Sequence, residues 1–174
     1  MKKLSIIWAS TLFILLLQSC IVSSKPKMAF FDNPQYDYKD AKFTSINVPM
    51  FLTKPIIKNA LRKDGESEEL INLIKKISDV KVMTVESGNE AMVSDYAKYL
   101  TNNNYEEWMT VRKEKETIKF QAKQNGEEIR KLLITIASGT ELVYVDISGK
   151  FTADDLSRII NYSEKNDVKK LVSK

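Results

Sequence analysis

The sequence predicts an α+β fold, in which a twisted, mainly antiparallel sheet of about five to six strands has helices packed on one face and a largely solvated second face. Two observations support this prediction. In residues 67–77 and 90–100 the apolar side chains recur every three or four positions, as in helices, whereas between residues 108 and 147 they alternate with polar ones, as in strands. Asn125-Gly126 lies between two alternating runs and is a strong signal of a tight hairpin. Strands that follow one another through short turns form an antiparallel meander.

The first half of the domain is expected to hold one strand and two helices. Residues 43–48 alternate as a strand does, and Pro49 ends the run. A short helix is expected from Pro55, because proline suits the first helical position. A second helix is expected from Ser67, with an acidic first turn and a basic last turn that complement the helix dipole.

The second half is expected to contain most of the sheet. After a strand at 80–85, Ser87-Gly88-Asn89-Glu90 has the form of a capping box with Ser87 as the cap, and a third helix follows with an apolar face up to Leu100. Thr152 is expected to cap a last helix. Alternation predicts the four strands of the meander near residues 108–112, 115–123, 129–137 and 142–147.

The amino-terminal stretch, residues 1–19, is typical of a secretory signal peptide. Lys2 and Lys3 precede an apolar segment of about 14 residues, shorter than the roughly 20 that a membrane-spanning helix needs. The stretch ends in Leu17-Gln18-Ser19-Cys20, which resembles the bacterial lipobox: an aliphatic residue lies three positions before a cysteine, and a small residue lies directly before it. The resemblance implies cleavage before Cys20 and attachment of diacylglycerol and a further acyl chain such as palmitate. The alternatives are an uncleaved anchor and an unmodified thiol.

Four segments follow from these patterns: a signal peptide at 1–19, the acylated Cys20 with a flexible tether at 20–41, one α+β domain at 42–162, and a weakly ordered or helical tail at 163–174. The tether contains four aromatic residues. They are expected either to dock on the domain or to enter the bilayer interface. These residues are Phe30, Phe31, Tyr36 and Tyr38.

Composition excludes several classes of active site. The chain has 27 basic and 23 acidic residues, a balance that does not favour a nucleic-acid partner. It has no histidine, which excludes histidine-activated nucleophiles and the commonest zinc ligand. Its single cysteine, Cys20, excludes an intrachain disulfide. We therefore expect no catalytic residues, no metal and no cofactor, and a protein that is not an enzyme.

Three lysines, Lys115, Lys119 and Lys123, share one face of an expected strand. They form a candidate anion-binding face for a phospholipid or lipopolysaccharide phosphate. The alternative is a solvated face whose lysines deter edge pairing.

Two acidic clusters have structural explanations. Asp154 and Asp155 follow Thr152 at a helix start, where capping and the helix dipole explain them better than a metal or acid–base role. Residues 105–108 (YEEW) are interpreted as a junction between a helix and a strand.

Residues 127–134 (EEIRKLLI), followed by 147–152 (ISGKFT) and Leu156, resemble a family of small Bacteroidota lipoproteins catalogued as domain of unknown function 4252. The likeness runs from about residue 43 to 160. It implies a cell-envelope lipoprotein and brings no reaction, cofactor or site residue. In that group, a lipidated cysteine without acidic residues just after it implies the periplasmic side of the outer membrane, and residues 21–25 are of this kind.

These observations favour a non-enzymatic, lipid-anchored, periplasm-facing interaction or structural module of the cell envelope. Its expected partners are membrane lipid, through the acylated Cys20, and an envelope protein, with no nucleic acid. The alternative is a carrier or sensor of a small amphiphile held between sheet and helices. An enzyme that works through carboxylates is a third possibility.

Overall fold

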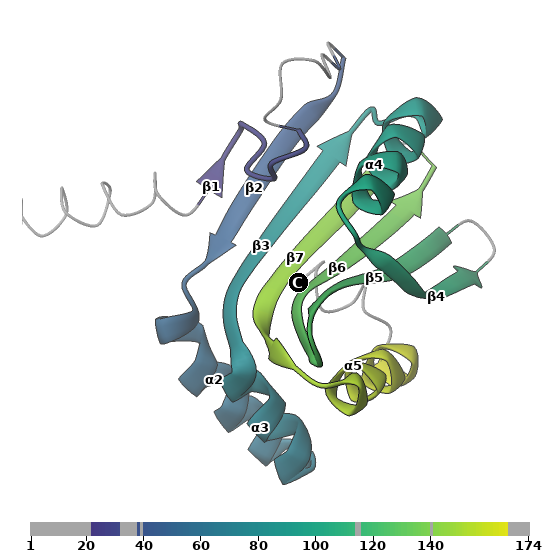
Figure 1. Ribbon diagram of the computed structural model, residues 1–174. Helices are drawn as coiled ribbons and strands as arrows, with labels where there is room; N and C mark the ends of the chain where they lie inside the picture. Colours follow the sequence, from purple (N-terminus) through teal and green to yellow (C-terminus); the bar gives the residue numbers. More distant parts are fainter. Residues whose placement is uncertain (1–21, 32–37, 39, 114–115, 140, 167–174) are drawn as a thin grey trace, which may run out of the picture.

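The computed structural model describes residues 22–31, 38, 40–113, 116–139 and 141–166. Its strands form one open, twisted antiparallel sheet in the order β1-β2-β3-β7-β6-β5-β4 (Figure 1). The strands are β1 (Val22–Ser23), β2 (Lys42–Val48), β3 (Ile77–Glu86), β4 (Glu106–Lys113), β5 (Glu116–Asn125), β6 (Glu128–Ser138) and β7 (Glu141–Phe151). The helices are α2 (Met50–Lys63), α3 (Glu68–Lys76), α4 (Glu90–Asn102) and α5 (Ala153–Asn166).

The predicted fold class is confirmed, with seven strands instead of five to six. The helices lie on both faces of the sheet, which differs from the expected arrangement on one face. Met92, Tyr96 and Leu100 of α4 pack on the face that we call the α4 face, against the side chains Met83, Val85, Leu133, Leu142 and Tyr144. The opposite face, here the α2 face, packs against α2, α3 and α5 through Met50, Leu73, Leu156 and Ile160.

Alternation along the strands explains how one sheet supports two cores. Successive side chains of a strand point to opposite faces. In β6 Leu132 and Ile134 belong to the core of the α2 face and Leu133 to that of the α4 face, and β7 divides Val145 and Tyr144 in the same way. The central strands are therefore apolar on both faces, which requires a cover on each side.

Helix α2 begins at Met50, five residues before the expected start at Pro55. The backbone amides of Leu52 and Thr53 both donate to the Pro49 carbonyl, at 2.9 and 3.1 Å, and form the first turn. Met50 is buried and fixes this turn on the sheet. Pro55 therefore lies inside the helix and removes one backbone hydrogen bond near its amino end, where the loss disturbs the fewest turns.

Side chains cap the first turns of α4 and α5 through hydrogen bonds to backbone amides. The cap of α4 is Asn89, whose Oδ1 accepts from the Met92 amide at 2.8 Å, and not Ser87. Ser87 has a φ of 59°, in the left-handed region, and it lies two residues before the cap. At α5, Thr152 is the cap as expected: its Oγ1 accepts from the Asp155 amide at 3.2 Å, while the Asp155 carboxylate accepts from the Thr152 amide at 2.8 Å.

The segment between β1 and residue 31 is docked on the domain. Val22 and Ser23 pair with Ile46 and Ser45 of β2. Met28, Phe30 and Phe31 are buried in the core of the α4 face, and the Phe31 ring lies 5.3 Å from the Tyr96 ring and 5.0 Å from the Tyr144 ring. Of the two expectations for the aromatic residues, docking on the domain therefore holds for Phe30 and Phe31.

The edges of the sheet are short or irregular. On one side β1 covers β2 with only two residues. On the other side β4 has a bulge between Glu107 and Met109. Bulges and charges are the means by which natural sheets avoid adding strands at their edges.

Candidate functional site

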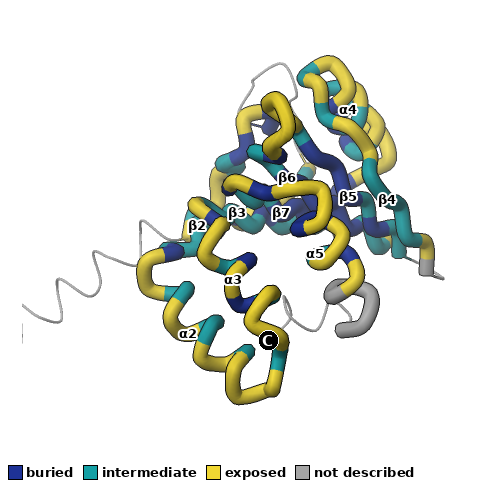
Figure 2. Tube along the Cα trace, turned by 60° about the horizontal axis from the view of Figure 1, so that its bottom comes forward, coloured by how far each residue is buried: buried dark blue, intermediate teal, exposed yellow. Residues whose placement is uncertain are grey.

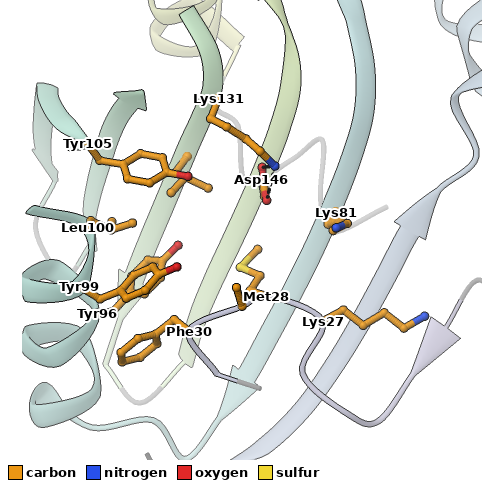
Figure 3. A pocket seen from close by; sticks show the side chains of 12 residues that line it. Lys27, Met28, Phe30, Lys81, Tyr96, Tyr99, Leu100, Tyr105, Lys131 and Asp146 are labelled. Atoms are coloured by element: carbon orange, nitrogen blue, oxygen red, sulfur yellow. Dashed lines mark hydrogen bonds and ion pairs between the residues drawn. The ribbon is translucent and has the colours of Figure 1, made fainter. Parts of the chain in front are cut away.

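A pocket of about 220 Å³ opens on the α4 face and collects polar side chains from distant parts of the chain (Figure 3). Helix α4 and the residues after it supply one wall, the strands β3, β6 and β7 supply the floor, and the docked segment supplies the opposite wall. Twelve residues line the pocket: Lys27, Met28, Ala29, Phe30, Lys81, Tyr96, Tyr99, Leu100, Tyr105, Lys131, Leu133 and Asp146.

The floor follows from strand register. Asp146 of β7 lies directly opposite Lys81 of β3 and Leu133 of β6, so the three side chains share the α4 face. The Lys131 Nζ atom lies 3.1 Å from both carboxylate oxygens of Asp146, which gives a two-centre ion pair inside the pocket. Among the described residues, the ion pair of Lys81 is a long contact with Asp79, at 3.9 Å. The pocket therefore has a net positive character, with one ammonium group nearly free.

The wall from α4 is a cluster of tyrosines. Tyr96 and Tyr99 are three positions apart and project from the same side of the helix, with rings stacked 6.3 Å apart. Burial, with the nearby Asp146 as a further cause, raises the pKa of Tyr105 to about 12. Burial raises the pKa of Tyr96 still further above its ordinary range. The phenol groups of Tyr96 and Tyr105 therefore stay protonated at neutral pH and can donate hydrogen bonds.

The opposite wall comes from the docked segment. Figure 3 shows Met28 and Phe30 facing the tyrosines, whereas Lys27 extends away from them toward β1. Phenol donors beside an ammonium group, in a space of this size, suit a small polar or anionic group such as a carboxylate. The volume of about 220 Å³ is below that of most sites for drug-sized ligands, at roughly 300–1,000 Å³.

A second, larger pocket of about 390 Å³ lies between α4 and the strands β5 and β6. Its lining is mixed. Val93, Ala97, Ala137 and Leu142 are apolar, and Lys119 is the cation among the lining residues. Thr135, also in the lining, is buried, and its Oγ1 atom has no hydrogen-bond partner among the described residues. An unpaired buried hydroxyl next to free space is a candidate ligand contact.

The expected anion-binding face is only partly described, because Lys115 lies outside the described residues. Lys119 and Lys123 do share one face of β5, as alternation predicted. Each has a partner: Lys119 Nζ lies 3.3 Å from Glu107 Oε2, and Lys123 Nζ lies 5.5 Å from the centre of the Tyr105 ring. Hydrogen bonds from Thr110 and Lys119 lower the pKa of Glu107, which keeps that carboxylate charged. These contacts occupy the two lysines within the fold.

The lipidation site and the lipobox, Leu17, Gln18, Ser19 and Cys20, also lie outside the described residues. They lie close to the fold in sequence, because β1 begins at Val22, two residues after Cys20. Among the described residues, no helix is long and apolar enough to cross a membrane. Nor do three potential metal-ligating side chains come together anywhere in that part of the chain.

The pocket residues were missed in the sequence because they come from five separate segments. No short motif joins Lys81, Tyr105, Lys131 and Asp146. One signal was available: Asp146 interrupts an apolar run in β7, and Lys131 directly precedes the apolar run of β6 that begins at Leu132. Charged residues in strands that are buried on both faces need a partner, and here they pair with each other.

Comparison with known proteins identifies a family. The model of a family described as a domain of unknown function (DUF4252) matches residues 36–159, which is most of the chain. Curated proteins and solved structures give no match.

Proposed function

Because the chain belongs to the DUF4252 family, whose description assigns no role, we propose its function from the site: a bacterial lipoprotein of the cell envelope, of the kind found in Bacteroidota, that acts by binding and not by catalysis. Cys20 carries the lipid and the domain faces the periplasm from the outer membrane. The pocket on the α4 face receives a small anionic or polar group of the partner, such as a carboxylate side chain of an envelope protein. The protein is not an enzyme in this proposal.

The observation that carries the proposal is the shape and charge of that pocket. Tyr99 and Tyr105 present phenol donors, and Lys81 presents an ammonium group with only a 3.9 Å contact to a carboxylate. Donors and a cation that surround a small open space recognise an acceptor group without the need for a reactive side chain. The lipobox supports the envelope location, because it predicts a lipid at Cys20.

The anchor is tested by mass spectrometry of the amino-terminal peptide from isolated membranes. We expect a peptide that begins at residue 20 and carries diacylglycerol and an acyl chain. Cys20→Ala is expected to keep the signal peptide and to lack lipid. An unmodified wild-type Cys20 would contradict the anchor and leave the pocket untouched.

The pocket is tested by site-specific photo-crosslinking in intact cells. A photoreactive phenylalanine analogue replaces Tyr99 in one strain and the neighbouring Lys98, which is exposed on α4 and absent from the pocket, in a matched control. We expect the Tyr99 strain alone to capture a defined envelope protein, and Lys81→Glu to reduce that capture. Equal capture by both strains, or none, would contradict binding at the pocket.

A second candidate function, a carrier of a small amphiphile, is favoured by one observation. The pocket of about 390 Å³ has a mixed lining, in which apolar side chains lie beside Lys119, Glu90 and the unpaired Thr135 hydroxyl. Lipids extracted from the purified protein would be identified by mass spectrometry, with Ala97→Leu as a variant that fills the pocket. We expect a co-purifying amphiphile that is lost in the variant, and an empty wild-type protein would contradict this function.

A further inference from the structure

The exposed apolar side chains gather in one corner of the molecule. Among the described residues, the large hydrophobic side chains that are exposed all belong to β1, β2 and α2. Isolated exposed hydrophobic residues are normal, but a cluster of this kind marks an interaction surface. Their exposed fractions are 50% for Val22, 36% for Ile46, 79% for Phe51, 54% for Leu52 and 68% for Ile56.

Most of this surface is the first half of α2. Met50 points into the core, and the outward positions of the next two turns are Phe51, Leu52 and Ile56. Figure 2 shows α2 as a largely exposed tube beside the buried strands. An amphipathic helix of a globular protein normally presents charged residues to solvent. The first half of α2 instead presents apolar side chains to solvent.

The second half of α2 is basic. The helix contains Lys54, Lys58, Arg62 and Lys63, and no acidic residue. Lys58 follows Phe51 by seven positions, and Lys63 follows Ile56 by seven, so each lysine continues the same side of the helix two turns further on.

Two of these cations stay available for a ligand. Lys54 donates to the Lys75 carbonyl, at 3.2 Å, and Arg62 lies 3.6 Å from Glu68. Lys58 and Lys63 make no ion pair with any described residue. The outward side of α2 thus changes from apolar to cationic along its length.

The first described residue after the lipidation site lies in this corner. In the antiparallel ladder Ser23 lies opposite Ser45 and Val22 opposite Ile46, so Val22 lies toward the end of β2 at which α2 begins (Figure 1). Val22 is the second residue after Cys20, and two residues span at most about 7 Å. A lipid on Cys20 would therefore be held near the first turns of α2.

We propose that α2 is a second membrane contact, which lies on the anionic leaflet that holds the lipid of Cys20. Phe51, Leu52 and Ile56 enter the boundary between headgroups and acyl chains, and Lys58 and Lys63 bind lipid phosphates. This proposal rests on the proposed lipid anchor. A basic amphipathic helix with apolar residues on its other part binds anionic surfaces in this way, and a nearby lipid supplies the second signal for stable attachment.

The test uses the chain from residue 20 with Cys20→Ser, so that no lipid contributes to binding. The described contacts begin at Val22, so removal of the signal peptide leaves all of them in place. Binding is measured by co-flotation with vesicles of phosphatidylethanolamine and phosphatidylglycerol, and with vesicles of phosphatidylcholine alone. We expect binding to the anionic vesicles only, which decreases as salt is added.

Two variants of α2 are compared with matched controls. Phe51→Ser/Ile56→Ser and Lys58→Glu/Lys63→Glu are each expected to weaken binding about tenfold or more. The control Lys98→Glu/Lys150→Glu makes the same charge change at two exposed lysines elsewhere and is expected to bind as the parent does. Circular dichroism confirms that each variant is folded.

Three results would overturn the proposal: no binding to anionic vesicles by the parent, equal loss in the control, or loss on Lys119→Glu/Lys123→Glu with α2 variants unaffected. The last would assign the contact to the β5 face. Failure of the anchor is a separate result, since it is seen as an unmodified Cys20 in membranes, whereas the vesicle assay contains no lipidated protein.

Discussion

Replacement of Phe31 by alanine tests whether the segment before β2 is a working part of the fold. The Phe31 side chain is 6% exposed, and its ring lies within 6 Å of the rings of Phe30, Phe43, Tyr96 and Tyr144. A buried phenylalanine replaced by alanine typically costs 3–5 kcal/mol, roughly, because apolar contacts are lost and a cavity remains. The total free energy of unfolding of a domain of this size is about 5–15 kcal/mol.

The expected loss of stability for Phe31→Ala is smaller than about 3–5 kcal/mol if the segment can leave the domain without unfolding it. The described segment pairs with the sheet only through the two residues of β1, so its release costs little beyond its own contacts. We therefore expect Phe31→Ala to lower the free energy of unfolding by about 2–4 kcal/mol. Urea unfolding, followed by Trp fluorescence and far-ultraviolet circular dichroism, measures this value on the chain from residue 20 with Cys20→Ser.

Hydrogen exchange separates local release from global unfolding. The Phe31 amide donates to the Met28 carbonyl at 3.0 Å and closes a turn between two side chains that are buried in the docked state. Peptides that cover residues 22–31 should exchange faster in the variant than in the parent. Phe51→Ala is the matched control, since Phe51 is 79% exposed and its loss should change stability by less than about 0.5 kcal/mol. A loss below about 1 kcal/mol for Phe31→Ala, with unchanged exchange, would refute the packing argument.

Three further predictions concern single side chains. Gly149→Ala should destabilise the fold by about 1–3 kcal/mol in urea unfolding, because a Cβ there would meet the Phe151 ring and lie 2.7 Å from the Lys76 carbonyl oxygen. A change below about 0.5 kcal/mol would show that both the ring and this carbonyl group move freely. Burial opposes ionisation of Asp155, but hydrogen bonds from Lys76 and Thr152 outweigh burial and lower the pKa below the ordinary 3.8. The ionised Asp155 therefore stabilises the fold above pH 3.8, and this contribution is lost as the pH falls through the lowered pKa. Asp155→Asn should accordingly cost about 1 kcal/mol at neutral pH and less in acid, and a cost independent of pH would contradict this assignment. Tyr105 should ionise near pH 12 by ultraviolet absorbance, a step that Tyr105→Phe removes, and an ordinary value near 10 would mean that the side chain is not buried as described.

Local patterns predicted most elements of the fold. Asn125-Gly126 gave the hairpin, since Gly126 has a φ of 65°, which the tight turn requires. The meander and the last helix follow the predicted order with small shifts at their ends. These elements depend on neighbours in sequence, and alternation or helical spacing reports such neighbours directly.

The second core could not be predicted from local patterns. Phe30 and Phe31 lie in a stretch with no sustained period, and their partners Tyr96 and Tyr144 are more than sixty residues away. The Tyr144 ring of β7 is covered jointly by Tyr96 of α4, at 4.8 Å, and by Phe31 of this segment, at 5.0 Å. The pocket could not be predicted for a different reason: Lys131 and Asp146 are only 15 residues apart, but their pairing depends on the register between β6 and β7.

The short or bulged edges of the sheet have a consequence for molecules that are packed closely on a membrane surface. If the protein is held on a membrane by the proposed lipid anchor, it meets copies of itself at a far higher effective concentration than a protein free in solution. The outer strand β4 carries Glu106, Glu107 and Arg112 along with its bulge, and β1 offers only two residues for pairing. Neither edge is a good template for a strand from a neighbouring molecule. Dense packing side by side can therefore increase without growth of an intermolecular sheet.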